Sequence, residues 1–130
     1  MFTHRRNLRY VVVDYLQEIG TEEGKDHRKS MVSWLRILKK IAEDKKLALI
    51  VASQITRDVE FRKDQRPLLS DFKPQYGLNF IDNLWYVFRP LYYHKYAKSS
   101  LAELIVAKSK LDGPHSRALQ WIQRELAFRF

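Results

Sequence analysis

Two short apolar runs with an amphipathic stretch between them constrain the fold of this chain more than any other feature. The runs at 10–13 and 47–52 are apolar, contain several β-branched residues and are typical of buried strands. Between them, apolar residues recur at spacings of three and four after Asp26, a residue suited to capping a helix. A strand, a helix and a strand in this order predict a parallel pair joined by a crossover. The expected apolar face of the helix comprises Met31, Trp34, Leu35, Leu38, Ile41 and Ala42.

The second half of the chain predicts antiparallel strands. Residues 56–79 are polar and contain turn-forming Pro and Gly, which predicts a loop with at most one short helical turn. Beyond this loop three more strands are expected, the last two joined by the strong turn signal D-G-P: 84–88, 101–108 and 116–122. We therefore expect an α/β domain with a mixed sheet, parallel at the start and antiparallel at the end.

Composition limits the classes of protein to which the chain can belong. Its 130 residues fit a single domain, and a hydrophobic fraction of 45% is enough to fill a core. The absence of cysteine excludes disulfide scaffolds, cysteine nucleophiles and thiolate metal sites. No apolar run is long enough to span a bilayer and no signal segment opens the chain, so we expect a cytoplasmic protein without a membrane partner. The net charge of +9 suits a polyanionic partner.

Polar residues follow both of the predicted parallel strands. Asp14 comes directly after the first strand, and Ser53 and Gln54 follow the second. In open α/β sheets, ligands bind at the carboxyl ends of strands. A carboxylate there can hold a magnesium ion through water, and a neighbouring glutamine can sense a terminal phosphate or orient water. An acidic residue after a strand is also common as a cap or turn residue, so Asp14 alone does not establish such a site.

The segment at 20–26, G-T-E-E-G-K-D, has the outline of a phosphate-binding loop but not its chemistry. The pattern G-x-x-x-x-G-K-S/T requires one more residue between the glycines and a hydroxyl after the lysine. Here Asp26 stands in place of the hydroxyl, and Glu22 and Glu23 would repel phosphate. No other stretch supplies the pattern, so the printed sequence contains no loop of the kind that grips nucleotide phosphates.

A series of ordered motifs carries a resemblance to a known family. In order they are V-V-V-D-Y-L-Q (11–17), A-S-Q-I-T-R-D-V-E (52–60), R-P-L-L-S-D-F (66–72), R-P-L-Y-Y (89–93) and A-E-L-I-V-A-K (102–108), with F-R-F closing the chain. The series resembles the C-terminal RecA-like motor domain of DnaB-type replicative DNA helicases. It corresponds to the second part of that domain, from the Walker-B strand onward, and the family's Walker-A loop and following catalytic Glu have no counterpart. The resemblance implies a truncated domain over residues 1–130 with a partial RecA-like sheet.

The resemblance implies a share of an ATP site. Asp14 would be the Walker-B carboxylate and would hold magnesium, and Gln54 would link the γ-phosphate to the DNA-binding loops. Lys108 and Lys110 would reach the γ-phosphate of the neighbouring subunit, although Lys110 stands where the family has an arginine and cannot make bidentate phosphate contacts. The implied cofactors are ATP and Mg²⁺ in the intact family, neither held tightly by this chain alone.

The resemblance also implies a loop that holds the backbone of single-stranded DNA, on which Arg66, Ser70, Lys73 and Gln75 would lie. The family continues this loop as L-R-E-S-G, whereas this chain reads F-K-P-Q-Y. Lys73 keeps the positive charge, but Pro74 removes a carboxylate and a backbone donor. The departures therefore fall where ATP and DNA would be handled, and the hydrophobic strands are kept.

Other conspicuous side chains have simpler explanations. The three tryptophans lie in apolar periods and are expected in the core rather than as base-stacking platforms. The tyrosines at 92, 93 and 96 either stack on a base or close an edge of the sheet. No histidine has a partner at metal-ligand spacing, and the charged face of the predicted helix is expected to be solvated.

Three functional hypotheses follow. The first is a piece of a helicase motor that translocates on single-stranded DNA in the intact protein but does not hydrolyse ATP by itself. The second is a non-catalytic paralogue that binds DNA or docks on a helicase as an accessory. The third is an unrelated basic α/β binding domain. A RecA-like sheet without its first strand and phosphate-loop helix would expose an edge and an apolar face, which favours self-association or binding to helicase subunits.

Overall fold

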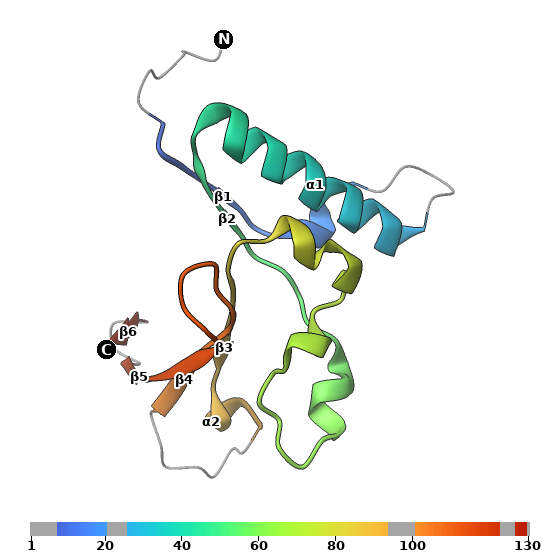
Figure 1. Ribbon diagram of the computed structural model, residues 1–130. Helices are drawn as coiled ribbons and strands as arrows, with labels where there is room; N and C mark the ends of the chain where they lie inside the picture. The colour runs from blue at the N-terminus through green and yellow to red at the C-terminus, as the bar shows by residue number, and fades with distance from the viewer. Residues whose placement is uncertain (1–7, 21–25, 94–100, 123–126, 130) are drawn as a thin grey trace. The chain divides into compact units, whose positions relative to one another are not determined.

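The computed structural model describes residues 8–20, 26–93, 101–122 and 127–129 (Figure 1). The chain divides into two compact units, Met1–Ile55 with Phe72–Ile81 and Thr56–Asp71 with Asp82–Phe130. In chain order the strands and α-helices are β1 (Tyr10–Val13), α1 (His27–Lys45), β2 (Ala48–Val51), β3 (Leu84–Phe88), α2 (Pro90–Tyr93), β4 (Leu101–Lys108), β5 (His115–Ile122) and β6 (Ala127–Arg129). Among the residues that the structure describes, no helix is long and apolar enough to cross a membrane.

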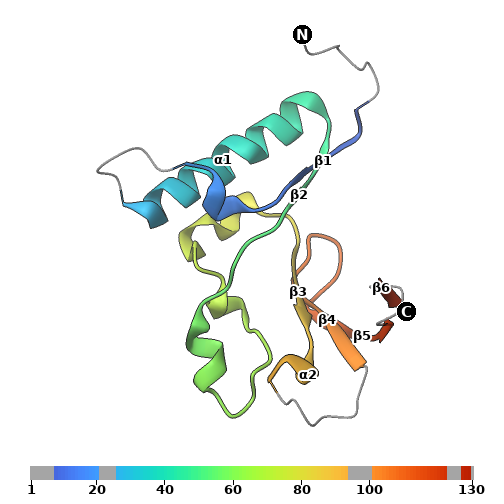
Figure 2. The same ribbon diagram turned by 180° about the vertical axis from the view of Figure 1, so that it is seen from behind.

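The first unit contains the predicted strand, helix and strand. β1 and β2 pair in parallel, from Tyr10 opposite Ala48 to Val13 opposite Val51, and α1 lies alongside the pair (Figure 1, and from behind in Figure 2). The side chain of Asp26 caps the helix by accepting a 2.8 Å hydrogen bond from the backbone N–H of Arg28. The parallel pair and the helix cap are therefore confirmed.

The expectation that both strands are fully buried is wrong. Side chains alternate along each strand between half-buried and exposed positions, and Tyr10, Val12 and Ile50 are 65%, 58% and 54% exposed. These three residues, which we call the bare face, lie on one side of the pair, where the register sets Val12 opposite Ile50. The reason is that a single helix covers a single face of a sheet, and parallel sheets are normally covered on both.

The core of the first unit forms where α1 meets the 3₁₀ helix η4 (Gln75–Phe80). Met31 and Leu35 are the buried residues of the helix, so the predicted apolar face is right at its centre, whereas Ile41 is 42% exposed. The two elements approach closely because Gly77 has no side chain, and a Cβ atom at this position would lie 2.6 Å from Cδ1 of Leu35.

The second unit contains a four-stranded antiparallel sheet in the order β3-β4-β5-β6, which confirms the antiparallel strands predicted for the second half. Strand β6 has no counterpart in the prediction. Among the side chains of this sheet that the structure describes, the buried ones are Tyr86, Phe88, Ala102, Val106 and Leu119. Trp85 alternates with them and is 58% exposed, so its assignment to the core is wrong.

Residues 56–79 hold more structure than the one turn expected. Three 3₁₀ helices form here: η2 (Arg57–Phe61), η3 (Leu69–Asp71) and η4. The composition of the segment is polar, but several of its residues are buried, among them Val59, Asp71 and Phe72. Such short turns have no hydrophobic period of their own, and they are fixed by contacts elsewhere in their units.

Candidate functional site

The carboxyl ends of β1 and β2 carry the residues predicted for magnesium and phosphate. Hydrogen bonds continue past the strands, from Ala52 N–H to Val13 O at 2.9 Å and from Leu16 N–H to Ala52 O at 2.9 Å. They place Asp14 at the same edge of the sheet as Gln54. Both residues are exposed, so a ligand can reach this edge.

Gln17 joins this edge, and the sequence analysis gave it no role. Its Nε2 donates to the hydroxyl of Ser53 at 2.9 Å, and its Oε1 accepts from the backbone N–H of Gln54 at 3.2 Å. The amide therefore fixes the backbone that carries Gln54 relative to the turn after β1. The available signal was its position in the V-V-V-D-Y-L-Q motif, three residues beyond the carboxylate.

The edge is suited to a hydrated cation rather than to a metal cage. Within the ranges that the structure covers, no three His, Cys, Asp or Glu side chains come together as a metal site. Asp14 would thus be a single carboxylate ligand, as is common for Mg²⁺, which keeps several waters and takes further ligands from phosphate.

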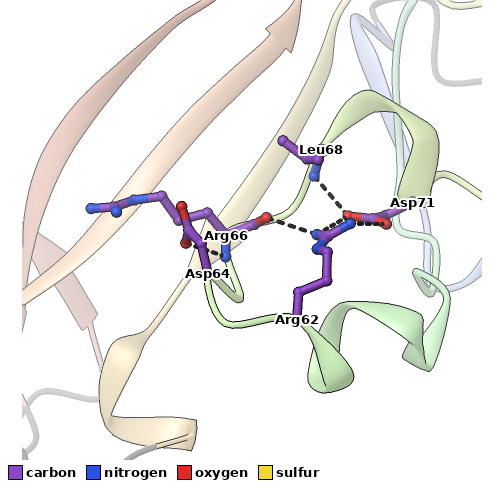
Figure 3. A network of polar contacts seen from close by, with 5 residues as sticks. All are labelled: Arg62, Asp64, Arg66, Leu68 and Asp71. Atoms are coloured by element: carbon purple, nitrogen blue, oxygen red, sulfur yellow. Dashed lines mark hydrogen bonds and ion pairs between the residues drawn. The ribbon is translucent and has the colours of Figure 1, made fainter.

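A network of polar contacts shapes the segment from Arg62 to Asp71, which we call the clasp (Figure 3). The Arg62 guanidinium donates to both carboxylate oxygens of Asp71, at 2.9 and 2.6 Å, and to the backbone oxygen of Arg66 at 2.9 Å. Asp71 also accepts from the backbone N–H of Leu68 at 2.7 Å, and only 3% of it is exposed. The carboxylate closes the segment on itself, and it is satisfied on both oxygens.

The side chain of Arg66 leaves the clasp on the opposite side from Arg62 (Figure 3). Its guanidinium makes a bidentate pair with Glu103 of β4, with Nε 2.9 Å from Oε2, and lies 5.7 Å from the centre of the Phe88 ring. Of the other residues predicted to contact DNA, Ser70 lies within the clasp and is exposed. Lys73 and Gln75 are exposed at the start of η4, in the first unit.

The pairs of the clasp shift the pKa values of their carboxyl groups. Burial alone would raise the pKa of Asp71, but the hydrogen bonds from Arg62 and Leu68 outweigh it and the pKa lies below its ordinary value. The hydrogen bonds from Arg66 lower the pKa of Glu103. Burial raises the pKa of Tyr86, whose hydroxyl has no partner among the described residues, to about 12. The carboxylates of Asp71 and Glu103 are therefore ionised at neutral pH.

The predicted lysines lie at the end of β4. Lys108 is the last residue of the strand and stands opposite Leu84. Lys110 follows in the turn, where its ammonium is 3.6 Å from the carboxylate of Asp82 and its backbone N–H donates to the side chain of Asn83 at 3.3 Å. The side chain of Lys110 is 70% exposed, so its charge is presented to solvent.

Nothing in the sequence indicated that three residues hold the clasp in place: Arg62 and Asp71 within it, and Glu103 on β4. Asp71 and Glu103 stand in the quoted motifs, yet a motif does not tell which side chain binds a ligand and which one holds the backbone. Their partners lie 9 and 37 residues away in the sequence, at separations that no local pattern reveals.

Comparisons with known proteins agree with the motif series. The profile of the DnaB-like helicase C-terminal domain matches residues 1–129. The replicative DNA helicase DnaC of Bacillus subtilis (strain 168) is 36% identical over 108 residues, and the replicative DNA helicase DnaB of Geobacillus stearothermophilus is 35% identical over 108 residues. Each alignment covers 80% of this chain and 24% of the relative, so the chain spans about a quarter of the length of these relatives.

Solved structures show the same similarity in three dimensions. A DnaB-like replicative helicase, described with its interactions with primase, matches 93% of this chain and 30% of its own with a TM-score of 0.84 and 30% identity. A solved ATPase domain matches 97% of this chain and 46% of its own with a TM-score of 0.87 and 30% identity. The RecA-like α/β class is therefore confirmed. By its sequence and by its fold, this chain belongs to the family of DnaB-like helicase C-terminal domains.

Proposed function

We propose that this chain is the second part of a replicative helicase motor domain, which contributes strand-end residues to an ATP site and a loop to single-stranded DNA. The observation that carries the proposal is the shared edge of β1 and β2, where Asp14 and Gln54 follow paired strands and Gln17 holds the backbone of Gln54. This edge is where ligands bind in open α/β sheets.

In the ATP site, Asp14 is the proposed magnesium-holding carboxylate and Gln54 the proposed contact to the terminal phosphate. Bound magnesium supplies charge neutralisation of the phosphates. Lys108 and Lys110, at the end of β4, are proposed to contribute positive charge toward the nucleotide of a neighbouring subunit. Because the printed sequence has no G-x-x-x-x-G-K-S/T loop, we propose that this chain alone does not hydrolyse ATP.

For DNA, the proposed contacts are the exposed residues Ser70, Lys73 and Gln75, with Lys73 as the positive charge. Phosphate contacts of this kind are independent of base sequence and weaken as salt displaces the lysine from the backbone. Arg66 lies four residues before Ser70, and its guanidinium is paired with Glu103.

Binding of a labelled oligothymidylate to the purified chain tests the DNA half of the proposal. We expect salt-dependent binding, with Lys73→Ala reducing both the affinity and the salt slope, because one phosphate contact is lost. Lys40→Ala, on the exposed side of α1, is the matched control that removes the same charge elsewhere. Absence of binding at low salt, or equal losses in the two variants, would contradict the proposed contact.

A second candidate function is a non-catalytic accessory that docks on helicase subunits. The bare face of Tyr10, Val12 and Ile50 favours it, because three large apolar side chains exposed together on a parallel pair are typical of a surface that packs against more protein. The mass of the chain in solution, alone and mixed with a replicative helicase, separates the two candidates. A stable complex with the intact helicase supports the accessory role.

A further inference from the structure

The side chain of Arg66 is held by contacts within the protein, unlike that of a surface arginine that is free to bind a phosphate. Two of its guanidinium nitrogens bond the carboxylate of Glu103, and its planar group lies over the ring of Phe88. Phe88 and Glu103 are themselves partners across the β3–β4 ladder, so both contacts of Arg66 come from one place on the sheet. A planar, bidentate and stacked arrangement of this kind is specific to arginine.

The backbone of Arg66 is held as well. Its carbonyl oxygen accepts from Arg62 at 2.9 Å, and its N–H donates to the side chain of Asp64 at 3.0 Å. Arg62 in turn is fixed by the buried carboxylate of Asp71, which also bonds the N–H of Leu68. The clasp therefore has two anchors: Asp71 inside it, and the Arg66–Glu103 pair that ties it to β4.

We propose that Arg66 is a positioning residue, which holds the clasp in shape and ties it to β4 through Glu103, and that it does not contact nucleic acid itself. The inference rests on the proposed function in one respect, namely that the stretch beginning at Ser70 binds single-stranded DNA. Ser70 lies inside the clasp, so the shape of the clasp sets the position of the residue at which this stretch begins.

The positioning role and a direct phosphate contact predict opposite effects of reversing the charge of Glu103. Glu103→Arg releases Arg66 and adds two units of positive charge, which strengthens DNA binding if Arg66 or the net charge is what matters. If the pair positions the loop, the same change weakens binding despite the added charge. The control is Glu60→Arg, an exposed residue of η2 that receives the same charge change in the same unit.

The experiment measures binding of a labelled oligothymidylate at about 50 mM salt, where phosphate contacts are strong. We expect Arg66→Glu and Glu103→Arg each to weaken binding about tenfold, and the double variant Arg66→Glu with Glu103→Arg to return within about threefold of the wild type. Glu60→Arg is expected to bind as tightly as the wild type or more tightly. Recovery in the double variant shows that the two residues act as a pair.

Two results would overturn the inference while leaving the proposed function intact: tighter binding by Glu103→Arg that matches Glu60→Arg, or a double variant no better than Arg66→Glu. If the wild type does not bind the oligonucleotide, the proposed DNA contact fails, and amide exchange decides the role of Arg66 by itself. Faster exchange at Leu68 N–H in both single variants, with recovery in the double variant, supports the tie, and unchanged exchange overturns it.

Discussion

The carboxyl edge of the parallel pair and the clasp use polar residues in opposite ways. At the edge, Asp14 and Gln54 are exposed, and the sheet that carries them leaves the bare face uncovered. In the clasp, Asp71 is almost fully buried and its two oxygens take three hydrogen bonds from within the same unit. The residues that we propose for ligand chemistry are thus exposed to solvent, whereas residues that shape the backbone have hydrogen-bond partners within the protein. Exposure and internal satisfaction separate the two roles better than charge does.

The largest loss of stability is expected from a substitution on the covered side of the first unit, where α1 packs against η4. Leu35→Ala should lower the free energy of unfolding by about 3 kcal/mol, because it leaves a cavity between α1 and η4. On the bare face, Ile50→Thr should change it by less than about 0.5 kcal/mol, since Ile50 is exposed and Thr keeps the β-branched shape. Urea unfolding measures both. Equal costs would show that the bare face is covered by the protein's own structure or by self-association.

The next largest loss of stability is expected from removal of the buried carboxylate of Asp71. Asp71→Ala should cost about 2–3 kcal/mol, because it removes the carboxylate that accepts hydrogen bonds from Arg62 and from the N–H of Leu68. Asp64→Ala is the matched control: Asp64 is exposed and accepts one hydrogen bond, from Arg66 N–H, so its loss should cost no more than about 1 kcal/mol. A control that costs as much as Asp71→Ala would remove the distinction drawn for Asp71.

The lowered pKa values predict acid sensitivity. The pKa of Asp71 and that of Glu103 lie below their ordinary values of 3.8 and 4.5 in the folded chain, so their pairs contribute stability above these values. This stability is lost as the pH falls below about 4.5 and through the folded-state pKa values. Urea midpoints between pH 6 and pH 3 should fall more steeply for the wild type than for Asp71→Asn. Parallel curves would contradict the assigned pairs.

The smallest effect on stability is expected at a polar group for which the described residues supply no hydrogen-bond partner. The buried hydroxyl of Tyr86 has no hydrogen-bond partner among the described residues, so Tyr86→Phe should change stability by less than about 0.5 kcal/mol or increase it. Loss of more than about 1 kcal/mol on urea unfolding would indicate a partner for this hydroxyl.

Much of the fold was predictable because its elements follow local periods. Local sequence patterns predict these elements directly: apolar runs for β1, β2 and β3, residue spacing for α1, and D-G-P for the turn. The bare face was not predictable from the sequence. An apolar run indicates that its side chains favour burial, but it does not indicate whether another element covers them. The 3₁₀ helices and the clasp were missed because their contacts join residues without a common period, such as Arg66 and Glu103. Asp14 and Gln54 could be placed at one edge because parallel strands bring their carboxyl ends together.

Magnesium-dependent ATP hydrolysis by the purified chain tests the central claim most directly. Asp14 and Gln54 are proposed to contribute to an ATP site, but the printed sequence has no G-x-x-x-x-G-K-S/T loop to hold the phosphates. We predict that the wild type and Asp14→Ala release phosphate at the same background rate, with and without single-stranded DNA. Magnesium-dependent turnover by the wild type that disappears in Asp14→Ala would contradict this account.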